Sequence, residues 1–402
     1  MTKLLNCILL IILLSSCNNS NRKVHGESKL KQLNTPANSV SAEPYLFTDK
    51  NDLVYLSWIE KTKDSSKLKF SVLNNDVWSA STTIASGNNW FVNWADYPML
   101  AMDENNLIAH ILQKSATGTY TYDVKYFTSV DKGKSWSDPK ILHDDGKQAE
   151  HGFVSLMPYE NNFFASWLDG RNTVGEVKNT TAHHDSHNGA MSLRAAVINT
   201  QGTKTAEWEL DNRVCDCCQT STVLTANGPI VVYRDRSDKE IRDISIVRFV
   251  NGKWTEPKNI FPDQWEIKGC PVNGPRAAAI GNSLAIAWFS SPDKKAQVNI
   301  IFSEDGGENF NRPIRIDGDS AIGRVDIVML DEKSAMVSWM EGAVIKAVRV
   351  YKDGKKEKPV IVASSSESRS SGFPQMTKSG NNIIFAWTDD KEKTIKVAKL
   401  AL

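Results

Sequence analysis

The residues best suited to chemistry are cysteines gathered in one short segment near the middle of the chain. Three of the six cysteines, Cys215, Cys217 and Cys218, fall within four residues, and Cys270 follows about one repeat later. Thiolates, together with the imidazole of His151, are ligands suited to copper or zinc. The spacing Cys-x-Cys-Cys differs from the Cys-x-x-Cys of simple zinc fingers, so we predict a less regular site.

Two other interpretations of the same cysteines remain open. The first is disulfide bonding, in which Cys270 would be a good partner for Cys215 or Cys218. The second is a redox-active or reactive thiol. A histidine-rich segment, in which His183, His184 and His187 could add ligands, strengthens the metal hypothesis.

A repeating β fold must position these residues. Short apolar runs that usually end in an aromatic residue recur roughly every 50 residues, whereas helical periodicity is nearly absent. The runs are Leu53–Trp58, Leu107–Leu112, Phe163–Trp167, Ile230–Tyr233, Leu284–Trp288, Ala335–Trp339 and Ile383–Trp387. Further short strands, separated by Asn, Asp and Gly turns, flank each run. We therefore predict an all-β propeller with four-stranded blades, seven by count and six as the alternative.

The last copy lacks room for its fourth strand. The segment Leu30–Asn34, upstream of the first copy, could supply that strand and close the ring, which would remove an exposed sheet edge.

Loops of a propeller emerge on two faces, and most candidate functional residues fall on one of them. That face carries the loops from strand four to the next strand one and from strand two to strand three. Its candidates are Trp90, Trp94, Asp96, His143, Asp144, Asp145, Glu150, His151, Asp169, Arg171, Arg213, the cysteines, Trp265, Arg276, Arg324 and Arg369. Positions counted back from the second strands place seven of these residues around the inner end of the axial channel: Trp94, Asp96, His151, Cys215, Cys217, Cys270 and Arg369. The charged run Arg234–Asp243 is expected to form a salt-bridged network that buttresses this face.

Two turns between third and fourth strands share a pattern of Ser, Asp, Gly and an aromatic residue. They contain Ser129, Asp131, Gly133 and Trp136, and Ser303, Asp305, Gly307 and Phe310. The aspartate can cap the turn, the glycine can take a positive φ, and the aromatic ring can pack between blades. These turns resemble the Asp-boxes of the sialidase (BNR-repeat) superfamily. The resemblance implies a propeller fold and a structural role for the boxes, on the face opposite the catalytic one.

The resemblance also implies a site. Sialidases bind a sugar carboxylate with three arginines, whose forked donors match a carboxylate. Arg276, Arg324 and Arg369 occupy nearby positions in three successive copies and could form such a set, with Asp96 as the acid and Tyr233 as the nucleophile. The alternative for each arginine is an ion pair between blades.

Other residues of the same face are candidates for substrate contact. Trp94 could stack on a sugar ring, and Arg171, Arg234 and Arg236 could bind polar groups of the substrate.

The N-terminus has the features of an exported lipoprotein. Lys3 precedes a short apolar run that ends in Leu-Ser-Ser-Cys, which resembles a bacterial lipobox. We expect residues 1–17 to be a signal peptide that ends at a lipidated Cys17, residues 18–36 to be a flexible tether, and residues 37–402 to be the propeller. The predicted location is the outer membrane, facing the periplasm, with the lipid as the only membrane contact.

The formal net charge of +1 over 402 residues gives no sign of a nucleic-acid partner. The leading hypothesis is a sialidase-like protein that binds or hydrolyses an acidic carbohydrate or glycoconjugate. The alternative is a propeller without hydrolytic activity, centred on a copper, zinc or redox site at the cysteines.

Overall fold

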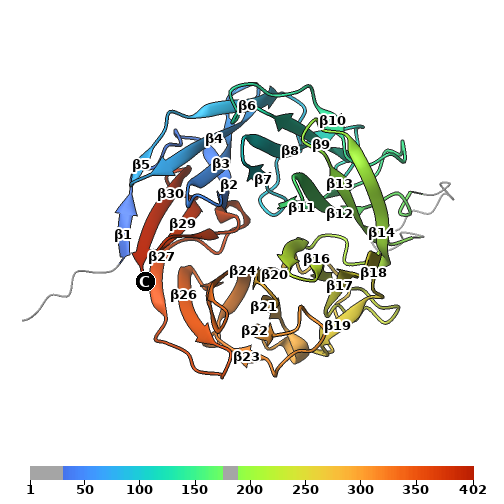
Figure 1. Ribbon diagram of the computed structural model, residues 1–402, viewed down its shortest axis with the longest axis vertical. Coiled ribbons are helices and arrows are strands. Elements are labelled where there is room, and N and C mark those ends of the chain that lie inside the picture. The colour runs from blue at the N-terminus through green and yellow to red at the C-terminus, as the bar shows by residue number, and fades with distance from the viewer. Residues whose placement is uncertain (1–29, 175–188) are drawn as a thin grey trace, which may run out of the picture.

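The computed structural model describes residues 30–174 and 189–402. Within these ranges, seven antiparallel sheets are arranged in a ring around a common axis (Figure 1). The predicted all-β propeller with seven blades is therefore confirmed. The predicted signal peptide, Cys17, and His183, His184 and His187 lie outside the described residues. No helix in the described ranges is long and apolar enough to span a membrane.

The blades follow one another along the chain, each running from the axis outward. Blade I contains β2 (Ser41–Thr48), β3 (Val54–Lys61), β4 (Ser66–Asn74), β5 (Val77–Trp78) and β6 (Thr82–Gly87). Blade II contains β7 (Leu100–Asp103), β8 (Asn106–Lys114), β9 (Tyr122–Ser129) and β10 (Lys140–Ile141). Blade III contains β11 (His151–Tyr159), β12 (Asn162–Asp169), β13 (Met191–Ile198) and β14 (Lys204–Val214). Blade IV contains β15 (Ser221–Thr225), β16 (Gly228–Arg234), β17 (Ile244–Val250), β18 (Lys253–Trp254) and β19 (Lys258–Phe261).

Blades V and VI contain β20 (Arg276–Ile280), β21 (Ser283–Ser290), β22 (Gln297–Ser303), β23 (Ile314–Arg315); and β24 (Ala321–Asp331), β25 (Ser334–Glu341), β26 (Val344–Tyr351), β27 (Val360–Ser364). Blade VII contains β28 (Gln375–Ser379), β29 (Asn382–Asp389), β30 (Thr394–Ala401) and β1 (Leu30–Leu33).

Strand β1 closes the ring from the other end of the chain. It pairs antiparallel with β30, Leu30 opposite Leu400 and Leu33 opposite Val397. Figure 1 shows β1 beside the C-terminal strand at the outer edge of blade VII. The predicted closure by Leu30–Asn34 is thus confirmed, and these residues, which fell within the range predicted as tether, belong to the propeller.

The second strand of each blade is buried on both faces, which explains its continuous apolar run. In β12, every residue after Asn162 is buried. The tryptophans of these strands fill the space between neighbouring blades, and Trp58, Trp167, Trp288 and Trp339 are at most 1% exposed. Packing of sheet against sheet therefore stabilises the ring.

Both Asp-boxes form the predicted turns. In the first, Ser129 Oγ donates to Asp131 Oδ1 (2.8 Å) and accepts the N–H of Gly133 (2.9 Å), while Asp131 accepts the N–H of Ser135. In the second, Ser303, Asp305 and Gly307 repeat the first two bonds at 2.8 and 2.9 Å. Trp136 packs edge-on against Phe70 of blade I, and Phe310 packs beside the core between blades IV and V. The boxes are structural, as predicted.

Three of the innermost strands carry β-bulges. The register shifts between Ala42 and Tyr45 in β2, between Gly152 and Ser155 in β11, and between Gly323 and Asp326 in β24. Each bulge contains a non-glycine residue with positive φ: Glu43 (53°), Phe153 (54°) and Arg324 (53°). Bulges re-aim side chains and concentrate near functional sites. Here they reshape the strands that line the axis.

Candidate functional site

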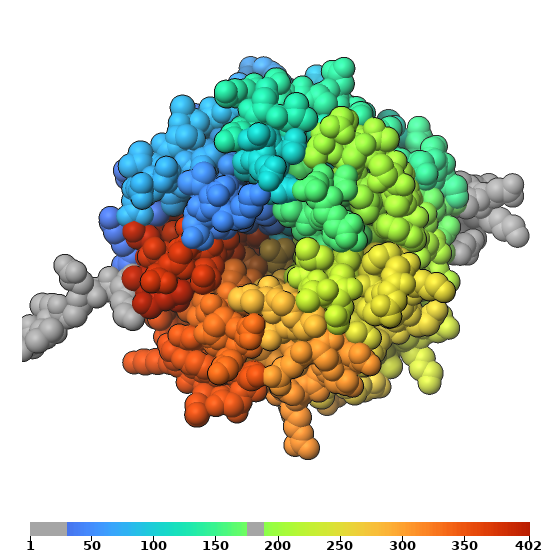
Figure 2. Space-filling view, in the orientation of Figure 1, coloured from blue at the N-terminus to red at the C-terminus, as the bar shows by residue number. Residues whose placement is uncertain are grey.

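Polar side chains from opposite blades meet at the axis. Arg276 Nε, at the start of β20, donates to Asp326 Oδ1 of β24 (3.0 Å), and Arg276 Nη1 donates to Tyr97 Oη (3.4 Å), in the loop before β7. Tyr97 stacks on Tyr45 of β2 at 6.2 Å between ring centroids. Burial lowers the pKa of the Arg276 guanidinium, and the negative charge of Asp326 raises it. The net result is a raised pKa. In the space-filling view, the surface is hollowed where the blades meet (Figure 2).

Aromatic and cationic side chains form a second group, which contacts Tyr97 through Phe373. Trp94, in the loop before β7, stacks on Phe373 at 5.6 Å, and Phe373 also contacts Tyr97 at 6.0 Å. The guanidinium carbon of Arg324 lies 4.9 Å from the Trp94 ring centroid, and that of Arg369 lies 6.0 Å from it. The structure therefore brings the three predicted arginines, from three successive blades, around one aromatic group.

These arginines differ in their partners. Arg324 is 5% exposed, and its guanidinium donates to Ser371 Oγ and to backbone carbonyls of Glu367, Ser368 and Gly372. Burial lowers its pKa to about 10. Arg369 is exposed. Within residues 30–174 and 189–402, no ion pair joins a carboxylate to Arg324 or Arg369.

Asp96 lies beside this group and is held as a neutral acid. Its Oδ1 accepts the N–H of Phe153 (2.8 Å), while Oδ2 is buried without a hydrogen bond. Burial raises the pKa of Asp96 to about 8. Tyr122 Oη donates to Glu150 Oε1 (2.8 Å), and burial raises the pKa of Glu150 to about 7. Asp96 also borders a cavity of about 10 Å³, with room for about one water.

Tyr233 is fully buried at the end of β16. Its hydroxyl donates to Asp211 Oδ2 (2.5 Å), and burial raises its pKa well above the usual value. A nucleophile must reach the substrate, so this placement does not favour the role predicted for Tyr233.

The run after Tyr233 forms the network that the sequence predicts. Arg234 is 1% exposed, donates to the carbonyls of Asn273, Arg242 and Phe289, and stacks on Trp265 at 4.9 Å. Arg236 bonds Asp216 and Glu240 at 2.8 Å each, and Arg242 also bonds Glu240. These partners favour a buttressing role over the substrate contact also predicted for Arg234 and Arg236.

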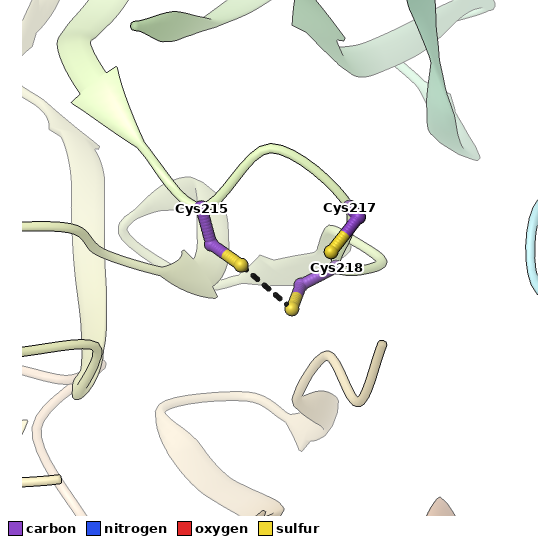
Figure 3. Close-up of side chains that lie close together, drawn as sticks. All are labelled: Cys215, Cys217 and Cys218. Atoms are coloured by element: carbon purple, nitrogen blue, oxygen red, sulfur yellow. Dashed lines mark hydrogen bonds between the residues drawn. The ribbon is translucent and has the colours of Figure 1, made fainter. Parts of the chain in front are cut away.

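The cysteines separate into a disulfide and a thiol pair. Cys217 and Cys270 are bonded, which corrects the expectation that Cys270 would pair with Cys215 or Cys218. The three sulfurs of Cys215, Cys217 and Cys218 lie within 4.8 Å of one another, so a small change of the loop decides which of them reaches Cys270. Cys215 Sγ and Cys218 Sγ are free and lie 2.9 Å apart (Figure 3). Arg242 donates to Cys215 Sγ (3.4 Å).

Charges near the thiol pair favour one thiolate. Burial opposes ionisation of Cys215, but Cys218 and the guanidinium groups of Arg242 and Arg234 lower its pKa below the usual value. Burial and Cys215 raise the pKa of Cys218. The arrangement holds one thiolate between a thiol and an arginine.

His151 belongs to a different cluster, which we call the His–Asp cluster: Asp123, His143, Asp145, His151 and Asp169. His143 and His151 stack in parallel with ring centroids 3.5 Å apart. Arg171 binds Asp169 through two hydrogen bonds of 2.8 and 2.9 Å, which gives this predicted substrate-binding arginine a carboxylate partner. In the described part of the chain, no group of candidate metal ligands combines His151 with the cysteines. The predicted joint Cys/His centre is therefore not assembled in this structure.

Several residues of the site were not predicted. Tyr45, Tyr97 and Asp326 line the axis, but no motif marks them. Tyr45 and Asp326 lie within innermost strands and Tyr97 lies just before one, and that position could have indicated them. His143 and Asp145 were assigned to the correct face, but their contact with His151 depends on a loop conformation that spacing does not give.

The comparisons with known proteins agree with this architecture. The family model described as BNR repeat-like domain matches residues 63–384, and the chain belongs to that family. The predicted resemblance to the sialidase superfamily is thereby confirmed. No match was found among curated proteins.

Solved structures with similar folds include carbohydrate-active proteins. An α-L-arabinofuranosidase from Fusarium graminearum has 9% identity and a TM-score of 0.51, with 91% of this chain and 98% of that chain covered. The NanB sialidase from Streptococcus pneumoniae has 9% identity and a TM-score of 0.46, with 93% and 94% covered. An ulvan lyase has 16% identity and a TM-score of 0.49, with 79% and 80% covered. At these identities, the likeness concerns the fold alone.

Proposed function

We propose that this protein binds an acidic carbohydrate near the propeller axis, on the face that carries the loops from strand four to the next strand one. The observation that carries the proposal is the group of Arg276, Arg324 and Arg369 around Trp94 and the axial tyrosines. Aromatic rings stack on sugars, and guanidinium groups bind carboxylates, so the two chemistries together suit an acidic sugar.

Arg369 is the residue best placed to contact the ligand first. It is exposed, lies over the Trp94 ring, and has no carboxylate partner among the described residues. Arg324 supports the same region from below, since its buried guanidinium bonds Ser371 Oγ and backbone carbonyls and pairs with no carboxylate among the described residues. Arg276 is already paired with Asp326, so it would orient the axial tyrosines and add positive charge.

We also propose that hydrolysis, if the bound sugar is a substrate, begins with proton donation from Asp96. Glycoside hydrolysis needs a carboxylic acid with a raised pKa to protonate the leaving oxygen. A pKa of about 8 keeps Asp96 protonated at neutral pH. Its burial requires the loop before β7 to open for that step.

A panel of oligosaccharides tests the binding and the hydrolysis separately. The purified protein is incubated with sialylated, uronic-acid-containing and neutral oligosaccharides, and binding is measured by calorimetry while products are separated by chromatography. We expect binding of one acidic class with no detectable binding of neutral analogues. Equal binding of neutral and acidic sugars would contradict the proposal.

A matched pair of variants connects binding to the site. Arg369→Ala removes the exposed guanidinium over Trp94, whereas Arg349→Ala removes an arginine that stacks on Tyr351 at 4.8 Å on β26. We expect only Arg369→Ala to lose affinity. For hydrolysis, Asp96→Asn should abolish product formation and leave binding within a few-fold.

The second candidate function is a copper- or thiol-based centre. The free Cys215 and Cys218 sulfurs lie 2.9 Å apart beside Arg242, and soft thiolates suit copper(I). This candidate predicts about one copper per chain in protein purified without chelator, lost in Cys215→Ser. Metal-free protein with two titratable thiols after unfolding would exclude copper, and failure of those thiols to react with a disulfide reagent in the folded protein would exclude a reactive-thiol centre.

We further propose that the protein is exported and anchored through a lipid on Cys17. The Cys217–Cys270 disulfide supports export, because disulfides persist in oxidising compartments. Mass spectrometry of the N-terminal peptide tests the anchor: a diacylated Cys17 is expected, and an unmodified or uncleaved N-terminus would contradict it.

A further inference from the structure

We propose that the His–Asp cluster is a binding site for one divalent first-row transition metal ion, with His143, His151 and Asp123 as ligands. The site lies between blades II and III. Its ligand atoms are nitrogen and oxygen, and it shares no residue with the cysteines or with the arginine group.

Four separate segments bring these side chains together. Asp123 lies near the start of β9, His143 and Asp145 lie in the loop after β10, His151 begins β11, and Asp169 ends β12. Asp123, His143 and His151 each offer a ligand atom, and the three atoms lie within 4.8 Å of one another. A second such group contains Asp145, His151 and Asp169. Side chains of both histidines are at most 4% exposed.

The nitrogens of His143 face only acceptors. Nδ1 lies 2.7 Å from Asp145 Oδ1, and Nε2 lies 3.4 Å from Asp123 Oδ1. A neutral imidazole has one N–H, so donation to Asp145 leaves the Nε2 lone pair directed at a carboxylate. Nε2 is buried and makes no hydrogen bond. A cation between Nε2 and Asp123 would satisfy both acceptors.

Both ring nitrogens of His151 also face only hydrogen-bond acceptors. Nδ1 lies 3.4 Å from the Tyr122 carbonyl oxygen, and Nε2 lies 3.1 Å from Asp145 Oδ2 and 3.6 Å from Asp169 Oδ1. The two imidazole rings stack face to face with centroids 3.5 Å apart, so ring nitrogens of both side chains lie in one small buried space beside Asp123.

The charges of the cluster point to a divalent ion. It contains three carboxylates, and Arg171 neutralises Asp169 through its paired hydrogen bonds. Two negative charges remain, on Asp123 and Asp145. A divalent cation would balance these two charges.

The donor set also indicates the class of metal. Imidazole with carboxylate suits zinc, manganese or iron, whereas thiolates select softer ions. Asp145 would hold His143 from behind through Nδ1, as carboxylates commonly orient metal-binding histidines. Asp169 already accepts two hydrogen bonds from Arg171, so we do not include it among the metal ligands.

The test is a titration of the whole protein, purified without a histidine tag and stripped with chelator. Zn²⁺ and Mn²⁺ are titrated separately by calorimetry, and bound metal is counted after gel filtration. We expect one equivalent of at least one of the two ions. Asp123→Asn and His143→Asn should each weaken its binding by at least about tenfold. Circular dichroism shows whether each variant is folded.

Two controls locate the ion. His110→Asn changes a buried histidine of β8 that is outside the cluster, and Cys215→Ser changes the thiol pair. Both should bind like the wild type. If Cys215→Ser loses the ion and His143→Asn keeps it, the metal belongs to the cysteines and the proposal is wrong. A wild-type protein that binds neither ion would overturn it as well.

A measurement on the wild type alone covers the case in which the variants do not fold. Co²⁺ bound by nitrogen and oxygen lacks the intense near-ultraviolet charge-transfer band of thiolate ligation. We expect visible d–d absorption without that band. A thiolate band, or no cobalt spectrum at saturating Co²⁺, would contradict the proposed site.

Discussion

Asp96 shows how a single buried side chain connects stability with chemistry. Its pKa is raised by burial from 3.8 to about 8, so the folded protein keeps a proton that the unfolded chain releases near pH 4. The neutral carboxyl group is most favourable for folding at low pH. Its contribution falls as the pH rises toward 8, because folding then requires uptake of a proton.

The pH dependence of unfolding checks this charge state. Asp96→Asn keeps a neutral side chain at every pH, so it should flatten the decline of the unfolding free energy between pH 4 and pH 8. The change in slope is at most about 1.4 kcal/mol per pH unit for one proton. Urea denaturation at several pH values measures it, with the exposed Asp138→Asn as control. Curves that run parallel for Asp96→Asn and wild type would contradict the raised pKa.

The cysteine pairing makes a separate prediction. The Cys217–Cys270 bond joins residues 53 apart in sequence, and Cys270 is exposed, so Cys270→Ser removes the bond with little loss of packing. We expect a loss of about 2–5 kcal/mol in the free energy of unfolding. Wild type measured with reductant should approach the variant. Peptide mapping without reduction should find Cys217 bonded to Cys270, and a Cys215–Cys270 peptide would refute the assignment.

At the scale of strands and turns, two glycines compare separate constraints: Gly133 of the first Asp-box and Gly252 of the turn between β17 and β18. Gly133 has φ +79°, and a Cβ there would lie 2.6 Å from the Phe70 ring of blade I. Gly252 has the same φ of +79°, but a Cβ there meets nothing within 4 Å. The pair therefore separates backbone strain from packing between blades.

Alanine substitutions at these glycines should differ accordingly. Gly252→Ala should cost about 1 kcal/mol, because only the backbone is strained. Gly133→Ala should cost about 1–3 kcal/mol more, since the neighbouring blade must move. Denaturant unfolding of both variants measures the difference. Equal losses would show that the box is not fixed by contact with blade I.

The strands and boxes could be predicted from sequence because their signals are local. Leu284–Trp288 and Ser303–Phe310 carry burial and turn chemistry within a few residues. The side-chain partners could not be predicted in the same way. Cys217 lies two residues from Cys215, and the loop between them decides which sulfur reaches Cys270.

Burial decided the outcome at other predicted residues. Tyr233 and Arg234 end a strand on the correct face, but the loops that cover them give both side chains internal partners. The grouping of Arg276, Arg324 and Arg369 could be predicted from the sequence, because equivalent positions in successive blades converge at the axis. Arg369 and Trp94 meet there as the repeat predicts.

For the whole molecule, ring closure depends on β1, the first strand of the described residues. Leu30 and Leu33 of β1 pack against the apolar clusters of blade VII. A chain that begins at residue 34 should lose the β1–β30 ladder and expose the edge of β30. We expect a lower thermal midpoint and earlier aggregation than in a chain that begins at residue 25. Identical midpoints would show that closure contributes little to stability.

The ring also explains why a site at the axis can be built from distant segments. Tyr45, Tyr97, Arg276 and Asp326 come from four blades, and closure fixes their mutual distances. A ligand at this position would contact several blades at once and stabilise the closed ring.

The most direct test of the proposed function is the affinity of Arg369→Ala relative to Arg349→Ala for the best acidic oligosaccharide of the panel. A lost charged hydrogen bond is worth about 1.5–3 kcal/mol, which corresponds to about a 10- to 150-fold weaker Kd. We predict that loss for Arg369→Ala alone, with Arg349→Ala binding like the wild type. Unchanged affinity in Arg369→Ala, or an equal loss in both variants, would contradict an acidic-carbohydrate site at the arginine group.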